Sequence, residues 1–186
     1  AASGGRRPMV NSVSLERFDA IDIARESNAV VIASAAGKTD LPADVEGRMS
    51  NLSELMPELK AKGFEDSDIH IDPLVLPIST NSANGKGFLE SVSCIREKYG
   101  DSIHIVAGLS NVSFGMPKRK QINQVFSYLA VQAGADGGIV DPAQINSRIL
   151  DSIDTGSEGF QLARELLVGN DEFGMNYITA CREGKI

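Results

Sequence analysis

Two polar residues of this sequence, Asp72 and Asn111, stand at or just after the ends of short apolar runs. Their side chains could bind and activate a flat heterocycle. A carboxylate can accept two parallel hydrogen bonds from neighbouring N–H donors of such a ring. A carboxamide can both donate and accept a hydrogen bond, so it can follow a ring nitrogen through a change of protonation. The pair therefore suits chemistry in which one group anchors a heterocycle and the other assists bond breaking at a ring nitrogen.

Both residues also have a purely structural explanation. Asp72 precedes Pro73, and an Asp-Pro pair often caps a turn. Asn111 lies in the turn GLSN, where asparagine tolerates a left-handed backbone conformation. Asn11 and Asp141 follow the same pattern after two further runs, and for Asp141 capping of the following helix is the favoured explanation. The residue types alone leave these alternatives open.

Five short runs rich in valine and isoleucine predict the strands that position these residues. The runs lack strict alternation of apolar and polar residues, as strands buried on both faces do. The predicted strands are residues 8–13, 29–35, 68–76, 103–109 and 137–142. Helical patterns separate them, so the sequence predicts an α/β fold with a parallel sheet and right-handed crossovers.

The helical patterns between and after these strands have recognisable ends. Ser14 is expected to cap the first helix, and Pro57 is expected to kink or split the second. Gly100 and Gly134 are expected to close the third and the fourth. Three further helical patterns follow Pro142. The predicted order is strand and helix, repeated five times, and then extra helices.

The predicted topology brings Asn11, Asp72, Asn111 and Asp141 to the carboxyl ends of strands, where parallel α/β proteins bind ligands. A closed (β/α) barrel needs eight strands, however, and only five are predicted. Five parallel strands would leave two open sheet edges that can pair with another chain. The chain could be a fragment, a complete open sheet or a module completed by dimerisation. A truncated module that forms a homodimer is the favoured interpretation.

The sequence GLSNVSFG at residues 108–115 resembles the Gly-(Leu/Val)-Ser-Asn-Val-Ser signature of the pterin-binding methyltransferase barrels. These include the methyltetrahydrofolate:corrinoid/iron-sulfur protein methyltransferases, and the residues IDPL at 71–74 match that family as well. The resemblance covers nearly the whole chain. It implies a single TIM-barrel type domain over residues 1–186 that begins at the family's fourth strand. The first three βα units would be absent, and residues 1–7 would form a flexible leader.

The resemblance also implies a role for each candidate residue. Asp72 would anchor the pterin, and Asn111 would hydrogen-bond N5 while the methyl group of methyltetrahydrofolate leaves. The methyl acceptor would be the cobalt of a corrinoid carried by a partner protein, and the chain itself would bind no metal. The other residues implied to bind the pterin substrate are Asn11, Gly108, Ser110, Arg119 and Asp141.

Two other functions remain open at this point. Dihydropteroate synthase shares the pterin barrel, but it would place Ser-Arg-Lys where this chain has Ser110, Asn111 and Val112. The second alternative is a non-catalytic module that holds a pterin or a partner chain. The basic cluster at residues 118–120 could steer the glutamate tail of folate or an acidic partner, or it could be an ordinary solvated surface.

Composition bounds the class of protein. A chain of 186 residues with 42% hydrophobic residues suits one globular domain, and a net charge of -7 disfavours a nucleic-acid binder. No apolar run approaches about 20 residues, so no membrane span is expected. Cys94 and Cys181 lack metal-ligand spacing and are expected to be reduced thiols of a cytoplasmic protein. His70 and His104 are expected to be interior residues of strands.

Overall fold

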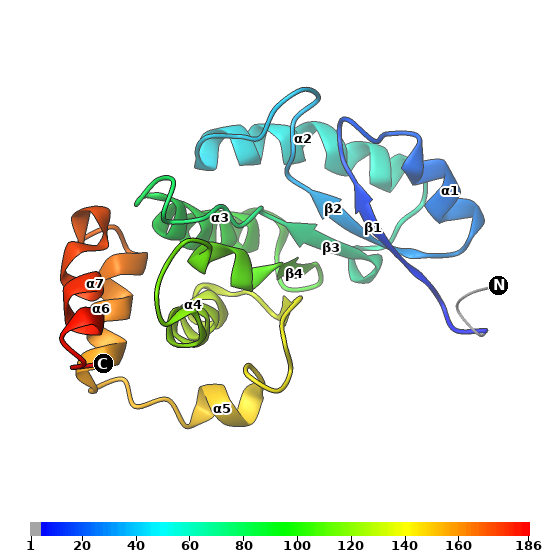
Figure 1. Cartoon of the computed structure of the whole chain (residues 1–186). Helices are drawn as coiled ribbons and strands as arrows, with labels where there is room; N and C mark the ends of the chain where they lie inside the picture. Colours follow the sequence, from blue (N-terminus) through cyan, green and yellow to red (C-terminus); the bar gives the residue numbers. More distant parts are fainter. Residues whose placement is uncertain (1–4) are drawn as a thin grey trace. The chain divides into compact units, whose positions relative to one another are not determined.

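A five-stranded sheet dominates the computed structural model, which describes residues 5–186. The pairs β1–β2, β2–β3 and β3–β4 are parallel. The sheet is open, with β1 and β5 at its two edges, so the predicted α/β fold with an incomplete set of barrel strands is confirmed. The strands, in their order across the sheet, are β1 (Met9–Val13), β2 (Val30–Ser34), β3 (Ile69–Asp72), β4 (His104–Ala107) and β5 (Gly137–Gly138) (Figure 1).

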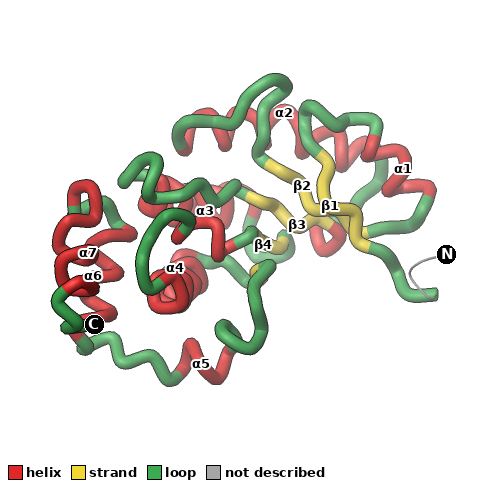
Figure 2. Tube along the Cα trace, viewed as in Figure 1, coloured by secondary structure: helices red, strands yellow, loops and turns green. Residues whose placement is uncertain are grey.

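Helices follow each of the first four strands along the chain, and loops join them (Figure 2). The α-helices are α1 (Ala20–Glu26), α2 (Val45–Ala61), α3 (Asn84–Tyr99), α4 (Arg119–Ala133), α5 (Ser147–Asp151), α6 (Glu158–Leu167) and α7 (Met175–Arg182). Three short 3-10 helices are η1 (Asp66–Asp68), η2 (Leu109–Ser113) and η3 (Glu172–Gly174). The chain divides into two compact units. The first unit holds the chain up to Leu74 together with Ser91–Ala107, and the second unit holds Val75–Glu90 and Gly108–Ile186.

In the first unit the sheet buries one face completely. Ile69, Ile71 and Ile105 are fully buried, and α2 contributes Leu52 and Leu59, which are fully buried as well. The alternate residues of β3 are only half-buried, as the twofold side-chain period of a strand requires. The core of this unit thus includes one face of the sheet, whereas the other face is mixed: it carries the half-buried His70 and Asp72 beside the buried Ile32.

The expected cap at Ser14 is wrong, and of the two effects expected of Pro57 the split is wrong while the kink stays a prediction. Ser14 does not cap α1; its hydroxyl accepts a hydrogen bond from the Arg17 backbone N–H at 3.2 Å in a separate turn, and α1 begins only at Ala20. Pro57 does not split α2, which continues to Ala61. The helix survives the proline because apolar residues on both sides of it, Met56 and Leu59 among them, are buried in the core.

The expected leader falls only partly in the described residues, since residues 1–4 lie outside them. Arg7, its last residue, is held by two contacts. Its guanidinium donates to Asp68 Oδ1 at 2.6 Å and to the Asn28 carbonyl oxygen at 2.8 Å. The ion pair lowers the pKa of Asp68. Arg7 therefore belongs to the first unit.

In the second unit α4 packs against α6, and α6 packs against α7 (Figure 1). Two aromatic pairs lie in this unit: Phe88 and Phe126 have ring centroids 5.1 Å apart, and Tyr128 meets Phe160 edge-on at 5.6 Å. Gly134 ends α4 with a φ of 112°, which confirms the predicted stop. The second unit therefore has its own core, formed largely between helices.

The last strand and the helix after it are shorter than the sequence predicts. β5 holds only Gly137–Gly138, because two glycines offer no side chains to pack and a turn at Asp141 follows soon after. α5 holds only Ser147–Asp151, and none of its residues is buried. Without a buried face, the helical pattern there has little to stabilise a longer helix.

Gly85 provides a test of the packing between α3 and α6 within the second unit. A Cβ atom at Gly85 would lie 2.3 Å from the Leu167 carbonyl oxygen, and that backbone cannot move aside freely. We expect Gly85→Ala to lower the free energy of unfolding by about 1–3 kcal/mol, measured by chemical denaturation. Gly156→Ala is the control, because its Cβ would meet only a side-chain oxygen of Asp154 at 3.3 Å. Equal stability of the two variants would contradict the packing described.

Candidate functional site

The register of the sheet brings two of the predicted site residues to one face of the first unit. Asn11 pairs with Ile32, and Ile32 pairs with His70. Register partners in a parallel sheet point to the same face, and Asp72 lies two residues after His70, so Asn11 and Asp72 share that face. Standard strand spacings put their Cα atoms about 12 Å apart. Asn11 lies in the middle of β1 rather than at its end, and it is exposed.

Asp72 ends β3 and holds the turn that follows. Its Oδ1 accepts a hydrogen bond from the Leu74 backbone N–H at 2.8 Å, and Leu74 adopts a left-handed conformation with a φ of 70°. Within residues 5–186 no other hydrogen bond reaches this carboxylate. Desolvation in the half-buried position raises the pKa of Asp72 to about 6, although the Leu74 bond opposes the shift. The free Oδ2 is therefore an acceptor that a ligand with N–H donors could engage.

The two histidines lie on the same face as Asn11 and Asp72. His70 and His104 are register partners on β3 and β4, and both are half-buried. Their rings stack with centroids 4.6 Å apart and planes 18° from parallel. Among the described residues, no group of three or more His, Cys, Asp or Glu side chains is placed to hold a metal ion.

Asn111 lies in the second unit, in the middle of η2. We call the segment from Gly108 to Lys118 the elbow, because it follows β4 and leads into α4. The Asn111 side chain is half-buried and makes no hydrogen bond to any residue in the range 5–186. Gly108 lies against this carboxamide: a Cβ atom there would come within 3.1 Å of Asn111 Nδ2. Glycine at this position thus leaves room for a carboxamide whose polar atoms are available to a ligand.

Arg119, the first residue of α4, fixes the elbow around Asn111. Its Nε donates to Ser113 Oγ at 3.0 Å, and its Nη2 donates to the Ser110 carbonyl oxygen at 3.1 Å. The guanidinium also lies over the Phe114 ring, 4.5 Å from its centroid. Arg119 therefore binds the turn on both sides of Asn111, which is a different use from contact with a folate.

Asp141 also lies in the second unit but makes only local contacts among the described residues. Its Oδ1 accepts from the Ala143 backbone N–H at 3.0 Å, and its Oδ2 accepts from Gln144 Nε2 at 2.7 Å. Both oxygens serve the turn after β5. The expectation that Asp141 caps the following helix is wrong, because Asn146 caps α5 by accepting from the Ile149 backbone N–H at 3.1 Å. The assignment of Asp141 to a ligand stays a prediction.

The structure thus groups the predicted residues in two sets. Asn11 and Asp72 share a sheet face in the first unit, whereas Gly108, Ser110 and Asn111 lie in the elbow in the second, where Arg119 of α4 donates to the Ser110 carbonyl oxygen. Sequence reasoning missed the part played by two residues: Ser113, which is fully buried, and Phe114. Their position just after the Ser-Asn-Val run was the only available signal. The ligand roles of all these residues stay predictions.

Comparison with known proteins places the chain in a family. The family of pterin binding enzymes matches residues 1–141, and the chain belongs to that family. A methylcorrinoid:tetrahydrofolate methyltransferase from Eubacterium limosum is 34% identical over 187 residues. The alignment covers 96% of this chain but only 64% of that relative. The resemblance inferred from residues 108–115 and 71–74 is confirmed.

The raised pKa of Asp72 predicts a pH-dependent stability. Because the folded-state pKa of about 6 exceeds the ordinary value of 3.8, ionisation costs the folded state stability as pH rises through this window. Asp72→Asn keeps the acceptor for Leu74 and removes that cost. We expect the variant to be more stable than the wild type by about 3 kcal/mol at pH 7.5 and to have nearly the same stability at pH 3.5. Denaturation at both pH values checks this, with the exposed Asp151→Asn as control; a gain independent of pH would contradict it.

The Arg119 contacts predict a loss of local order when the guanidinium is removed. Arg119→Met keeps the aliphatic stem but loses both hydrogen bonds to the elbow. We expect amide hydrogen exchange at Val112, Ser113 and Phe114 to become about tenfold faster, since one or two hydrogen bonds to a charged group stabilise the turn by about 1.5 kcal/mol or more. Lys120→Met, at the next exposed residue, should leave these exchange rates unchanged. If these amides stay equally protected in Arg119→Met, the elbow keeps its structure without the Arg119 hydrogen bonds, and the prediction is wrong.

Proposed function

We propose that this chain is part of an enzyme that moves a methyl group between N5 of a tetrahydrofolate and the cobalt of a corrinoid protein. The observation that carries the proposal is the Asn111 carboxamide, which the elbow positions but which has no hydrogen-bond partner among residues 5–186. A fixed, unpartnered amide in a pterin-binding enzyme is a group available to the reacting ring.

Asn111 would act on the nitrogen that exchanges the methyl group. When cobalt(I) attacks the methyl carbon, the carbon–cobalt bond forms and the carbon–nitrogen bond breaks, and its electron pair stays on N5. N5 is a poor leaving group unless this charge is stabilised and a proton is then taken up, which gives tetrahydrofolate. A hydrogen bond from the Asn111 amide N–H stabilises the charge as it develops. The amide oxygen can accept once N5 carries its proton, so one side chain serves both states.

Asp72 is proposed to anchor the pterin. The N3–H and 2-amino groups of the ring are adjacent donors, and a carboxylate can accept from both. The pKa of about 6 leaves Asp72 largely ionised at neutral pH, while its desolvation makes a partner for Oδ2 favourable. Asn11 shares the sheet face with Asp72 and is proposed as a further pterin contact.

The direction of transfer is a separate part of the proposal. The family resemblance seen in the sequence implies methyltetrahydrofolate as donor and the corrinoid as acceptor. The printed name of the Eubacterium limosum relative gives the opposite order, with the methylcorrinoid as donor. The same bond is made or broken in either direction, so the proposed site serves both, and an assay must be run from each side.

The corrinoid-protein partner and self-association of the chain are proposals too. The chain spans 64% of the length of the relative it matches, so the activity of a whole protein cannot simply be transferred to it. A module that binds a pterin without methyl transfer is the alternative. Within the described residues, no helix is long and apolar enough to cross a membrane.

A two-stage experiment tests the proposal. Titration with methyltetrahydrofolate first establishes whether the chain binds the pterin at all. Addition of a reduced corrinoid protein, followed by the absorbance of methylcobalamin, then separates a catalyst from a binder. The reverse reaction is followed with the methylated corrinoid protein and tetrahydrofolate. Pterin binding without a change of cobalt absorbance in either direction would favour the non-catalytic module.

Substitutions of Asn111 and Asp72 should separate catalysis from binding. We expect Asn111→Ala to reduce the rate of methyl transfer by a factor on the order of 10² to 10³, because one donor to the developing charge is lost. Asp72→Ala should instead weaken pterin binding by about 2 kcal/mol or more, the usual effect of losing a charged hydrogen-bond partner. Stopped-flow kinetics and calorimetry measure the two effects. Asn176→Ala, at an exposed position of α7, is the control; normal binding and transfer in both site variants would place the site elsewhere.

A further inference from the structure

A pocket of about 370 Å³ lies beside the elbow, entirely within the second unit. This volume falls in the range of small-molecule sites. One wall is apolar and the other is a polar turn, and no charged side chain lines either wall. The lining residues are Ile78, Ser79, Thr80, Asn81, Ser82, Met116, Leu166, Phe173 and Gly174. We call this the side pocket. Its neutral lining suits an uncharged, partly apolar group rather than a carboxylate or a phosphate.

The side pocket is continuous with the turn that carries Asn111. The Ile78 backbone N–H donates to the Val112 carbonyl oxygen at 3.0 Å, and Val112 is the neighbour of Asn111. Ser79 Oγ donates to the Phe114 carbonyl oxygen at 2.6 Å. The polar wall of the pocket is thus hydrogen-bonded to the elbow. The turn that carries Asn111 and the polar wall of the pocket thus support each other.

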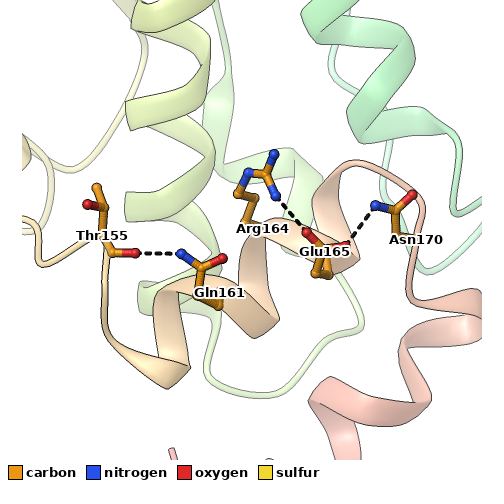
Figure 3. Close-up of polar contacts among 5 residues, drawn as sticks. All are labelled: Thr155, Gln161, Arg164, Glu165 and Asn170. Atoms are coloured by element: carbon orange, nitrogen blue, oxygen red, sulfur yellow. Dashed lines mark hydrogen bonds and ion pairs between the residues drawn. The ribbon is translucent and has the colours of Figure 1, made fainter.

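The opposite wall is fixed by contacts at the end of α6. Glu165 accepts hydrogen bonds from Arg164 Nη1 at 2.6 Å and from Asn170 Nδ2 at 2.7 Å (Figure 3). The buried Asp171 carboxylate accepts from two backbone N–H groups at the start of α7, at 3.0 Å and 2.9 Å. These bonds define the path of η3, which carries Phe173.

Phe173 is held in an unfavourable state on two counts. Its ring is 79% exposed to solvent, and its backbone has a φ of 56°, a left-handed conformation that bulky residues rarely adopt. An exposed ring costs the contacts that burial would give, and the backbone costs about 1 kcal/mol or more. A flat ligand stacked on the Phe173 ring would cover it and provide the contacts that the exposed ring lacks.

We propose that the side pocket binds the aminobenzoyl ring of a tetrahydrofolate, with Phe173 stacked against it. This inference rests on the proposed function, because it needs the pterin to lie at Asn111. The aminobenzoyl ring is uncharged and flat, and it is joined to the pterin by a two-atom arm, as the pocket's lining and position require. The glutamate carboxylates extend into solvent. Phe173 and Leu166 lie outside residues 1–141, the part matched by the family, so the pocket adds selectivity for folates over simple pterins.

Affinities for two ligands test the proposal. Tetrahydrofolate carries the ring, and 6-methyltetrahydropterin lacks it. We expect Phe173→Asn, which tolerates the left-handed backbone, to weaken tetrahydrofolate binding about tenfold and to change tetrahydropterin binding less than twofold. Met175→Asn is the matched control, because Met175 is exposed nearby but does not line the pocket. Equal weakening of both ligands, or of neither, would overturn the proposal.

A fluorescence experiment gives an independent result. The chain has no tryptophan, so Phe173→Trp introduces a single tryptophan at the pocket, which can be excited selectively over the three tyrosines. After correction for ligand absorbance, tetrahydrofolate should change its emission and 6-methyltetrahydropterin should not. Phe18→Trp, in the first unit, should respond to neither ligand. An identical response of Phe173→Trp to both ligands contradicts the proposal. If the wild type binds neither ligand, the proposed function fails as well, so the two failures can be told apart.

Discussion

Parallel strand pairing is the constraint on which the rest of this chain depends. A parallel strand can be joined to the next only by a crossover, so every strand must end in a turn that leads away from the sheet. The helix side of the sheet takes the isoleucines of β3 and β4, which are fully buried. The other face is mixed, and it carries Asn11 and Asp72 together with the buried Ile32. The sharing of one sheet face by the two candidate polar residues therefore follows from the same pairing that fixes the topology of the sheet.

The side chains of Asp72 and Arg119 differ in how their polar atoms are compensated for lost contact with water. Asp72 is desolvated and compensated by one backbone N–H only, so its pKa rises to about 6. Arg119 keeps its charge exposed and uses its planar fork to bind the turn around Asn111. Asp72 thus has a carboxylate oxygen that can still accept hydrogen bonds from a ligand, whereas Arg119 already donates two hydrogen bonds to the protein. Functional groups and the groups that position them can be distinguished by this difference in hydrogen bonding.

Local signals in the sequence predicted the parts of the fold that local interactions decide. The β-branched runs located the first four strands, whereas β5 covers only the two glycines before Ile139 and Val140. Gly134 ends α4 as predicted, because the left-handed conformation that stops a helix depends on the glycine itself. Pro57 was misjudged because the burial of α2, a tertiary effect, outweighed the local preference. At the site, the types of Asp72 and Asn111 identified them as candidates. The contacts of Arg119 with Ser113 and Phe114 could not be predicted, since they depend on how the elbow folds back on α4.

Under the proposed function, the chemistry of Asn111 also explains why the site need not fix the direction of transfer. Donation from the carboxamide to N5 stabilises the same charge whether the carbon–nitrogen bond is breaking or forming, so it lowers the barrier equally in both directions. An aspartate in this position would accept from protonated N5 only, and a lysine would donate only. The direction is then set by the relative stability and concentration of the two methyl carriers, which the carboxamide does not alter. Reversibility itself would hold for any catalytic group, and what the amide adds is one uncharged side chain that can donate to unprotonated N5 and accept from protonated N5.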